Sequence, residues 1–335
     1  MTAGEKHRTR GELLKISGSY WEACALHAAV MLNVFELMGE ENLPAGEVAA
    51  RLGAEGRGTE MLLNALAAMH LLSRKDGLFA NTYDSSTYLR PGSKEYVGDI
   101  IKHHHYLVAG WSRLHESVLS GKPARPDRVA DRGGDQLEAF LMGMFNLASG
   151  LAPRLVPTID MTGRKKLLDL GGGPGTYALH FCRVNKGLTA VVYDLPTTRH
   201  FAEKTINRFG MDDRVSFVEG DYLKDDLPGG FDAAWLSHVL HGEGPDACRL
   251  MLKKAAAALA PGGLLLIHEF ILDDTMDGPL HPALFSLNML LGTQEGRAYS
   301  ESQLAEMMRE AGLSDIRRLP FSSPAQTGIM AGTSS

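Results

Sequence analysis

The chain has 335 residues, of which 44% are hydrophobic, and a formal net charge of -6 at pH 7. This length exceeds that of a typical single domain, so we expect two domains with substantial cores. The negative charge argues against nucleic acid or an anionic membrane as a partner, and three widely spaced cysteines exclude a CxxC pair and a disulfide framework, which indicates a reducing, cytoplasmic setting.

Residues 1–95 are predicted to form a helical module that ends in a hairpin. The chain starts with a polar, charged stretch, and no uninterrupted apolar run approaches membrane-spanning length, so we expect a soluble protein. Apolar residues recur at helical spacing over 11–72, with a Pro/Gly break at 43–46. The Asp76-Gly77 pair between short apolar segments is typical of a hairpin turn. Helices followed by a hairpin indicate a winged helix.

Charge and hydrophobicity decide what this module does. Winged helices often bind DNA, but residues 1–90 contain nine Lys/Arg and eleven Asp/Glu, a net charge of -2 that suits phosphates poorly. Helices expected over 20–37 and 61–72 are more apolar than one small module can bury. We therefore expect a homodimer interface and no nucleic acid.

The pattern of apolar residues changes near residue 160. Residues 96–160 are predicted to be a helical linker and substrate lid. Beyond them, short apolar strands alternate with helical segments, which indicates a parallel α/β sheet. Ser300 and Gln303 form a capping-box pattern before a late helix. The predicted strands are 167–170, 190–193, 215–218, 233–236 and 264–267.

A glycine-rich segment follows the first of these strands. It is Asp169-Leu170-Gly171-Gly172-Gly173-Pro174-Gly175-Thr176, and it leads into an apolar helix. Glycines let the backbone pass close to a ligand, although they also serve simple strand-to-helix turns. A dinucleotide fingerprint would need glycine at position 176, where this chain has threonine, so a nicotinamide-dependent oxidoreductase is disfavoured.

Acidic and aromatic residues follow the next two strands. Asp194 ends the second strand, about twenty residues past the glycines, where a carboxylate can accept hydrogen bonds from ribose hydroxyls. Gly220-Asp221-Tyr222 ends the third strand and pairs an acceptor with a ring suited to adenine. Each residue alone could be an ordinary cap or turn residue. Three successive strand ends suited to methionine, ribose and adenine predict an S-adenosylmethionine site.

At these motifs the chain resembles the S-adenosylmethionine-dependent class I methyltransferases, specifically the O-methyltransferase family that includes caffeate, acetylserotonin and bacterial polyketide O-methyltransferases. The resemblance covers nearly the whole chain. It implies a winged-helix-like dimerisation domain over 1–95, a lid region over 96–160 and a Rossmann-like α/β catalytic domain over 161–335. Its most distinctive segments are the glycine loop, Tyr193-Asp194-Leu195-Pro196, Gly220-Asp221-Tyr222, Val239-Leu240-His241, Pro261-Gly262-Gly263, Glu269, Asn288-Met289-Leu290 and Glu310-Ala311-Gly312.

The resemblance also implies which residues hold the ligands. Ser237 stands where plant members tend to carry a lysine that contacts the cofactor. The expected S-adenosylmethionine residues are Asp169, Gly171, Gly173, Gly175, Asp194, Leu195, Gly220, Asp221, Tyr222 and Ser237. The expected acceptor-pocket residues are Met144, Phe145, His238, Asn288 and Met289, with core packing as the alternative for each and a structural role as the alternative for His238.

His241, just beyond the fourth strand, is the expected general base. The sulfonium methyl is already electrophilic, so the protein must position an oxygen and accept its proton. A phenol-like hydroxyl with a pKa near ~10 can pass its proton to an imidazole with a pKa of about 6.5 during transfer. In the resembling family the matching histidine is the proton acceptor. Glu269, just past the next strand, could orient His241 and stabilise its cationic form.

Two departures from the family pattern affect this prediction. The acidic residue that usually follows the histidine is Gly242, and Ala298 replaces the position of a second carboxylate that flanks the histidine in some members. His241 would therefore depend on Glu269 alone. Because these losses concern the acceptor side, a nitrogen, sulfur or carbon acceptor stays an alternative to oxygen, as does a catalytically inactive regulator that binds S-adenosylmethionine.

The histidine run His103-His104-His105 suggests a metal, but successive residues on a helix point about 100° apart, so they cannot share one face. The resembling family works without metal. We therefore expect no catalytic metal, and a small hydroxylated aromatic molecule as substrate with S-adenosylhomocysteine as the cofactor product.

Overall fold

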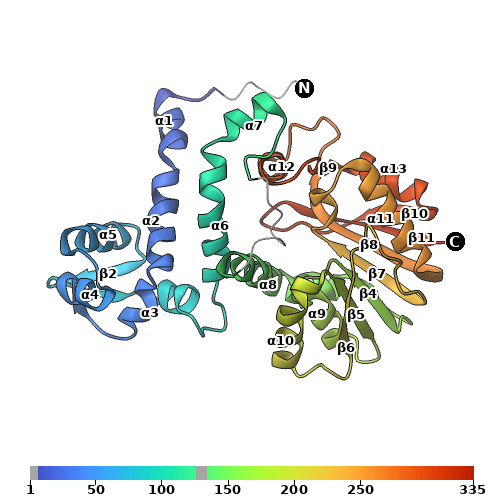
Figure 1. Ribbon diagram of the computed structural model, residues 1–335, viewed down its shortest axis with the longest axis horizontal. Helices are drawn as coiled ribbons and strands as arrows, with labels where there is room; N and C mark the ends of the chain where they lie inside the picture. The colour runs from blue at the N-terminus through green and yellow to red at the C-terminus, as the bar shows by residue number, and fades with distance from the viewer. Residues whose placement is uncertain (1–6, 126–133) are drawn as a thin grey trace. The chain divides into compact units, whose positions relative to one another are not determined.

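The computed structural model describes residues 7–125 and 134–335. The first six residues of the polar start and part of the predicted lid region lie outside them. The chain divides into two compact units, residues 1–106 and 107–335 (Figure 1).

The described part of the first unit contains helices and a small sheet, as the sequence predicts. Its helices are α1 (Arg10–Gly18), α2 (Tyr20–Met31), α3 (Val34–Met38), α4 (Ala45–Leu52) and α5 (Gly56–Ala68), followed by a π-helical turn, η1 (Ser85–Leu89). Its strands are β1 (Leu43–Pro44), β2 (Leu72–Lys75) and β3 (Leu78–Asn81), in the order β1-β3-β2. The core includes Val34, Phe35, Met38, Leu63, Leu66 and Phe79.

The hairpin prediction is confirmed. Lys75 pairs with Leu78 in an antiparallel ladder, and Asp76 and Gly77 between them have φ of 50° and 79°. Positive φ at both central residues is the geometry that Asp-Gly favours in a two-residue turn. The order of helices and hairpin is that of the expected winged helix, and that classification stays a prediction.

The expected helix over 20–37 is interrupted, so that part of the prediction is wrong. Asn33 adopts a left-handed conformation with φ of 57° and separates α2 from α3. Asparagine tolerates this conformation better than most residues, and apolar spacing alone does not report such a break. Similarly, α5 ends at Ala68, and Leu72 opens β2 instead of closing the helix.

Large apolar side chains stay exposed on the first two helices. Within the described residues, α1 contains no buried side chain. Trp21 is 68% exposed, and Leu14 is 64% exposed. Tyr20 and Met31 on α2 are exposed as well. Such a run of exposed apolar surface is typical of a protein-protein interface.

The helix α6 (Gly98–Trp111) contains the boundary between the units, and the second unit then builds one large sheet between helices. Its other helices are α7 (Leu114–Ser120), α8 (Asp135–Leu155), α9 (Thr176–Val184), α10 (Arg199–Phe209), α11 (Pro245–Ala257), α12 (Leu280–Gly292) and α13 (Glu301–Glu310), with short 3-10 turns η3 (Val156–Thr158), η4 (Pro196–Thr198) and η5 (Leu240–Gly242). Its strands are β4 (Lys166–Leu170), β5 (Thr189–Asp194), β6 (Val215–Glu219), β7 (Phe231–Ser237), β8 (Leu259–Leu272), β9 (Tyr299–Ser300), β10 (Leu313–Leu319) and β11 (Thr327–Ser334).

The five predicted strands form the parallel part of this sheet. The strand order is β10-β11-β8-β7-β4-β5-β6, with β9 beside β8. β6, β5, β4, β7 and β8 pair in parallel, whereas β11 and β10 pair antiparallel at the other edge. These two antiparallel strands were not predicted, because Gly328, Ala331 and Gly332 weaken the apolar pattern of β11. The capping box of Ser300 and Gln303 on α13 is confirmed.

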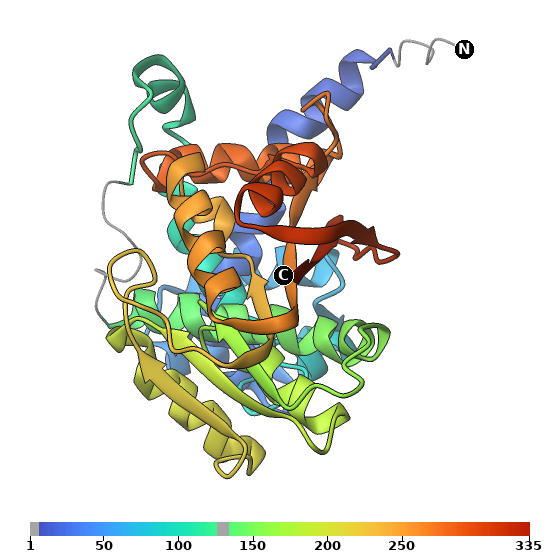
Figure 2. The ribbon, with the colours of Figure 1, turned by 90° about the vertical axis from the view of Figure 1, so that its right-hand side faces the viewer.

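Two hydrophobic layers cover the faces of the sheet (Figures 1 and 2). One layer packs α11 and α13 on the strands, and the other packs α8, α9 and α10. Along the chain, β4 is followed by β5 and β6 on one side, and β7 then returns to the other side of β4. In open α/β sheets, ligands bind beyond the carboxyl ends of the strands at such a reversal.

One helix is long and apolar enough to span a membrane when only its length and composition are considered. Among the described residues, the continuous segment Asp135–Thr158 of α8 and η3 is long and apolar enough, although polar residues interrupt its apolar stretches. However, 44% of its most apolar window is buried in the protein, and Ala152, Leu155 and Val156 lie in the core layer that contains α9. We therefore interpret α8 as a core helix.

Candidate active site

The glycine loop connects β4 to α9 at the point where the strand order reverses. Gly171, Gly173 and Gly175 all have positive φ, between 55° and 77°. A Cβ on Gly171 would lie 2.6 Å from Cγ2 of Val239, so the loop passes tightly against the segment after β7. A Cβ on Gly173 would have no neighbour within 4 Å. The backbone at Gly173 therefore has room for a ligand to approach.

Asp169 lies beneath this loop and is 1% exposed. Its Oδ2 accepts a 3.2 Å hydrogen bond from the backbone N–H of Ala178 in α9. Burial, with a contribution from the charge of Asp194, raises the pKa of Asp169 to about 7. The side chain thus supports the loop and the start of α9 from inside, and its direct contact with a cofactor stays a prediction.

Asp194, at the end of β5, points back to the glycine loop. Its Oδ2 accepts from the backbone N–H of Gly173 at 2.7 Å, and its Oδ1 accepts from the N–H of Leu195 at 2.7 Å. The hydroxyl of Thr198 donates to Oδ1 at 3.3 Å. Burial raises the pKa of Asp194, and these hydrogen bonds oppose the shift. Oδ2 accepts a single hydrogen bond here and has a second lone pair, so the group can still accept from a ligand hydroxyl.

The end of β6 lies beside Asp194, because the N–H of Gly220 donates to its backbone carbonyl at 3.0 Å. A Cβ on Gly220 would lie 1.9 Å from the hydroxyl of Tyr193, which explains the glycine. Asp221 accepts from the N–H of Leu223 at 3.0 Å and pairs with Lys224 at 2.8 Å.

Tyr222 is held by a residue that the sequence interpretation assigned no role. Its hydroxyl donates to Oε1 of Glu243 at 3.3 Å. Burial and the charge of Glu243 raise the pKa of Tyr222. Glu243 lies two residues beyond His241, and this position beside the histidine motif is the sequence feature that could have predicted a role for it. It connects the expected adenine ring partner with the loop that carries His241.

Ser237 is engaged inside the protein. Its Oγ lies 2.9 Å from Nδ1 of His268, whose Nε2 lies 2.9 Å from Oγ1 of Thr327. His268 is fully buried, and burial lowers its pKa well below the usual range. A contact between Ser237 and a cofactor stays a prediction.

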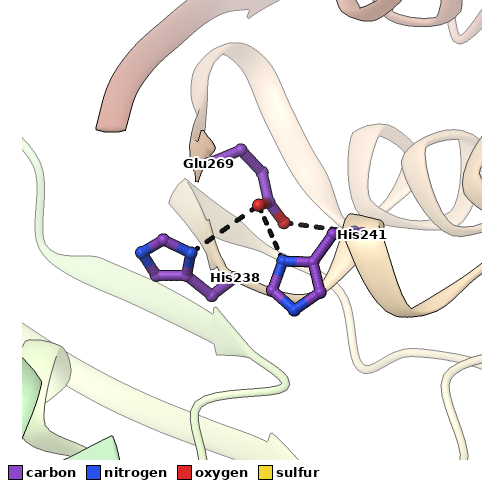
Figure 3. Close-up of side chains that lie close together, drawn as sticks. All are labelled: His238, His241 and Glu269. Atoms are coloured by element: carbon purple, nitrogen blue, oxygen red, sulfur yellow. Dashed lines mark hydrogen bonds and ion pairs between the residues drawn. The ribbon is translucent and has the colours of Figure 1, made fainter. Parts of the chain in front are cut away.

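His241 and Glu269 meet across two adjacent strand ends, as predicted (Figure 3). Nδ1 of His241 lies 2.8 Å from Oε2 of Glu269, and the backbone N–H of His241 donates to Oε1 at 3.3 Å. An ionised carboxylate only accepts hydrogen bonds, so Nδ1 carries the proton and Nε2 is left as the basic atom of the neutral ring. Figure 3 shows Nε2 pointing away from Glu269.

Glu269 is only 2% exposed, but its surroundings favour the ionised carboxylate. Burial alone would raise its pKa, but electrostatic interaction with His241 and the hydrogen bonds that His241 donates lower it well below the usual range. A permanent negative charge at this place stabilises the cationic form of His241.

A second histidine approaches the same carboxylate. Nδ1 of His238 lies 3.6 Å from Oε2 of Glu269, which is beyond hydrogen-bond distance. This Nδ1 is buried and has no hydrogen-bond partner. The backbone of His238 has φ of 57°, a conformation that few residues other than glycine adopt. Together His238, His241 and Glu269 place one potential metal-ligand atom each within 4.8 Å of one another.

Aromatic rings surround the two histidines. Phe285 on α12 contacts His241 with ring centroids 4.7 Å apart, and Phe270 lies 4.5 Å from His238. His281 lies 5.1 Å from Phe270. We name His238, His241, Phe270, His281 and Phe285 the aromatic cluster. The sequence interpretation missed Phe270, His281 and Phe285, although Phe285 precedes the predicted Asn288 by one helical turn.

The four predicted pocket residues outside the cluster fall into two groups. Phe145 on α8 is 9% exposed and packs on Phe209 at 6.3 Å, so its observed ring contacts are those of a core residue. Met144 beside it is half-buried. On α12, Oδ1 of Asn288 accepts from Nη2 of Arg125 at 2.9 Å, and Met289 is half-buried.

The two departures from the family pattern are visible in the same region. Gly242 ends the short turn η5, and its N–H donates to the carbonyl of Val239 at 3.2 Å. Ala298 is 1% exposed. Neither residue offers a side-chain acceptor, so the carboxylate that contacts His241 comes from Glu269.

Comparison with known proteins shows two matching family models and several similar enzymes. An O-methyltransferase domain model matches residues 129–314, and an O-methyltransferase dimerisation domain model matches residues 14–91. The chain is 35% identical over 325 residues to 3-hydroxy-5-methyl-1-naphthoate 3-O-methyltransferase of Streptomyces sahachiroi, covering 96% of this chain and 94% of that protein.

Two further comparisons bear on the cofactor and on the acceptor atom. The crystal structure of human N-acetylserotonin methyltransferase in complex with S-adenosylmethionine is 25% identical, with a TM-score of 0.88 and full coverage of both chains. L-tyrosine C(3)-methyltransferase of Streptomyces lavendulae is 28% identical over 92% of this chain and 88% of its own length. The first is named for its complex with the cofactor, and the second for methylation of carbon.

Proposed function

Since this chain belongs to the O-methyltransferase family and is an S-adenosylmethionine-dependent methyltransferase, we propose that it methylates a hydroxyl of a small aromatic molecule with His241 as general base. The observation that carries the proposal is the contact of His241 with the buried Glu269 carboxylate. His241 follows β7, which lies beside the glycine-loop strand β4, and Glu269 lies on β8 on the other side of β7. The proposed domains are a dimerisation domain over 1–95, a lid region over 96–160 and a catalytic domain over 161–335.

The residues at the strand ends fit S-adenosylmethionine. When bound, this cofactor supplies an electrophilic methyl group on a sulfonium sulfur. We propose that the open backbone at Gly173 approaches its methionine part, that Asp194 accepts from the ribose hydroxyls, and that Asp221 and Tyr222 hold adenine. Asp169, Leu195 and Ser237 complete the proposed set, with Asp169 supporting the loop from beneath.

His241 is proposed to accept the proton of the acceptor hydroxyl at Nε2. The oxygen would form the new bond to the methyl carbon with a lone pair while the carbon–sulfur bond breaks and its electrons return to sulfur. The electron pair of the O–H bond would stay on the oxygen as its proton passes to Nε2 of His241. Glu269 holds the ring with Nδ1 protonated, so the basic nitrogen faces away from the carboxylate. Positioning of the oxygen in line with the methyl group contributes the remaining rate enhancement.

The aromatic cluster supports a flat acceptor. Phe270 and Phe285 present rings beside His241 and His238, and aromatic side chains pack well on planar substrates. The proposed acceptor residues are Met144, Phe145, His238, Asn288 and Met289, to which we add Phe285. A relative named for a hydroxynaphthoate hydroxyl agrees with this class.

A second function is methyl transfer to another atom. The L-tyrosine C(3)-methyltransferase relative supports a carbon acceptor, and nitrogen and sulfur acceptors use the same cofactor site. A catalytically inactive regulator would retain cofactor binding without transfer. Chemical analysis of the methylated product distinguishes these acceptors from oxygen, and cofactor binding without any methylated product would indicate the regulator.

We propose that the protein is a cytoplasmic homodimer that uses the first unit as its interface. The exposed apolar surface of α1 and α2 and the matched dimerisation domain support the dimer. The three cysteines are free thiols, of which Cys182 and Cys248 are buried, and this supports a reducing compartment.

The experiment that tests the proposed function has two steps. Calorimetry measures binding of S-adenosylmethionine and S-adenosylhomocysteine, and a labelled-methyl screen against hydroxylated aromatics follows in the same preparation. We expect binding of both and transfer to an oxygen. Failure to bind the cofactor would overturn the cofactor site, and transfer only to carbon, nitrogen or sulfur would overturn the hydroxyl acceptor.

A further inference from the structure

We propose that His238, His241 and Glu269 form a binding site for a zinc-type transition-metal ion, and that its occupation switches off methyl transfer. The three side chains come from the segment after β7 and from β8, all within the second unit. In Figure 3 both imidazoles turn Nδ1 toward the Glu269 carboxylate. One ligand atom of each residue lies within 4.8 Å of the others.

Nδ1 of His238 lacks a hydrogen-bond partner, and the proposed methyl transfer does not supply one. Its Nδ1 is buried without a hydrogen bond, although the side chain as a whole is 24% exposed. It faces a carboxylate that is 2% exposed and has already paired with His241. A buried polar atom without a partner is destabilising, and a cation between the three groups would satisfy it.

The donor set and its spacing suit zinc. Two imidazole nitrogens and one carboxylate oxygen are ligands that zinc takes in sites with one remaining position for water. Zinc–ligand bonds of about 2.0–2.1 Å in a tetrahedron place neighbouring ligand atoms about 3.3 Å apart. The distances of 2.8 Å and 3.6 Å from Oε2 to the two Nδ1 atoms lie on either side of this value. Imidazole nitrogen also favours zinc, copper or nickel over magnesium and calcium.

Metal binding would remove the proposed base, and this consequence depends on the proposed role of His241. A neutral imidazole has one proton and one basic nitrogen. An ion on Nδ1 takes the lone pair there, so the proton that Nδ1 now shares with Glu269 must move to Nε2. Nε2 then donates instead of accepting, and a substrate hydroxyl can no longer pass its proton to it.

The binding test uses full-length protein without an affinity tag, in metal-free buffer and without S-adenosylmethionine. Calorimetric titration with Zn²⁺ should show one ion per chain, and Co²⁺ should produce the visible absorption of a tetrahedral site. His238→Asn should weaken Zn²⁺ binding by about 10- to 100-fold or more. The matched control is His281→Asn, in the same aromatic cluster, which should leave Zn²⁺ affinity unchanged.

Each result decides the proposal. Absence of stoichiometric Zn²⁺ binding up to about 100 µM, or equal binding by His238→Asn and the unaltered protein, would overturn the site. In a transfer assay, Zn²⁺ should inhibit and EDTA should restore activity, whereas Mg²⁺ should do neither. Stoichiometric binding without inhibition would overturn the switch and leave the site. Zn²⁺ binding is measured without cofactor or acceptor. Its result therefore does not depend on whether the proposed methyl transfer takes place.

Discussion

The backbone N–H of Gly173 donates a 2.7 Å hydrogen bond to Oδ2 of Asp194, which ties the glycine loop after β4 to the end of β5. One carboxylate therefore shapes the loop and faces the region where a ribose is expected. The proposed cofactor site is built on contacts between neighbouring strand ends, and substitutions there should affect cofactor binding before chemistry.

Asp194→Ala should weaken S-adenosylmethionine binding at least about tenfold, the effect of losing one charge-assisted hydrogen bond of about 1.5–3 kcal/mol. Turnover at saturating cofactor should change less, because His241 and Glu269 stay in place. Calorimetry and steady-state kinetics separate the two effects. Asp194→Asn is the matched control, since its amide oxygen can still accept from Gly173. Unaltered affinity in the alanine variant would contradict the ribose assignment.

His241→Asn should slow methyl transfer by about 10²–10⁴-fold, which is the usual contribution of a general base. Cofactor affinity should stay near its original value, because the proposed cofactor contacts are made by Ser237 and by residues at the ends of β4, β5 and β6, and not by His241. His281→Asn removes a neighbouring ring of the aromatic cluster and should cost less. Parallel loss of cofactor binding in His241→Asn would indicate a structural histidine.

Glu269→Gln should reduce kcat by up to ~10⁴-fold, as removal of the charge beside a catalytic histidine does in serine proteases. The amide keeps the size of the side chain but no longer stabilises a cationic ring. Nitrogen-15 NMR of His241 should show that the proton moves from Nδ1 in the variant, which a purely structural residue would not cause. An unchanged tautomer with reduced kcat would argue against the positioning role.

Asp169→Asn tests the pKa of about 7 of this buried carboxyl. The folded-state pKa is raised above the unfolded value of about 3.9, so the folded protein binds more protons between these values and loses stability as pH rises toward 7. The stability of the unaltered protein relative to Asp169→Asn should therefore fall with pH, by at most about 1.4 kcal/mol per pH unit.

Urea denaturation of both cofactor-free proteins between pH 5 and pH 8 measures this difference, and the decline should level off above the folded-state pKa. Asn keeps an oxygen that can accept from the N–H of Ala178, so the hydrogen bond is preserved. A difference that is constant over this pH range would mean that Asp169 is ionised throughout.

Trp21→Glu should weaken dimerisation, because Trp21 is 68% exposed on the apolar surface of α2. A central aromatic interface residue contributes about 2 kcal/mol or more, roughly a 30-fold change in dissociation constant. Light scattering over a dilution series measures it. Leu119→Glu is the control, since that side chain is 86% exposed but lies on α7. An unaltered protein that is monomeric at all concentrations would contradict the interface.

Some features follow from local sequence because local chemistry produces them. The five parallel strands show in short apolar runs, the hairpin in Asp76-Gly77, and the start of α13 in its capping box. The loop of Gly171, Gly173 and Gly175 needs positive φ, which glycine adopts without strain, so the sequence alone marks it.

Other features could not be predicted from the local sequence. The break at Asn33 depends on one left-handed residue inside an apolar run, and β10 and β11 are defined by pairing with β8 instead of by their own pattern. Phe145 fits an acceptor-pocket motif by position, and only the structure shows that its ring also packs on Phe209. In each case the neighbours in space, which the local pattern does not specify, determined the outcome.

The sequence by itself determined the parallel α/β sheet, the cofactor loop and the pair His241 and Glu269 as candidates, because backbone conformation and side-chain chemistry are local properties. Only the tertiary structure decided that both histidine Nδ1 atoms converge on Glu269 and that Glu243 holds Tyr222. Glu269 meets the histidines because its strand β8 pairs beside β7, and such side-by-side placement arises from the packing of strands distant along the chain.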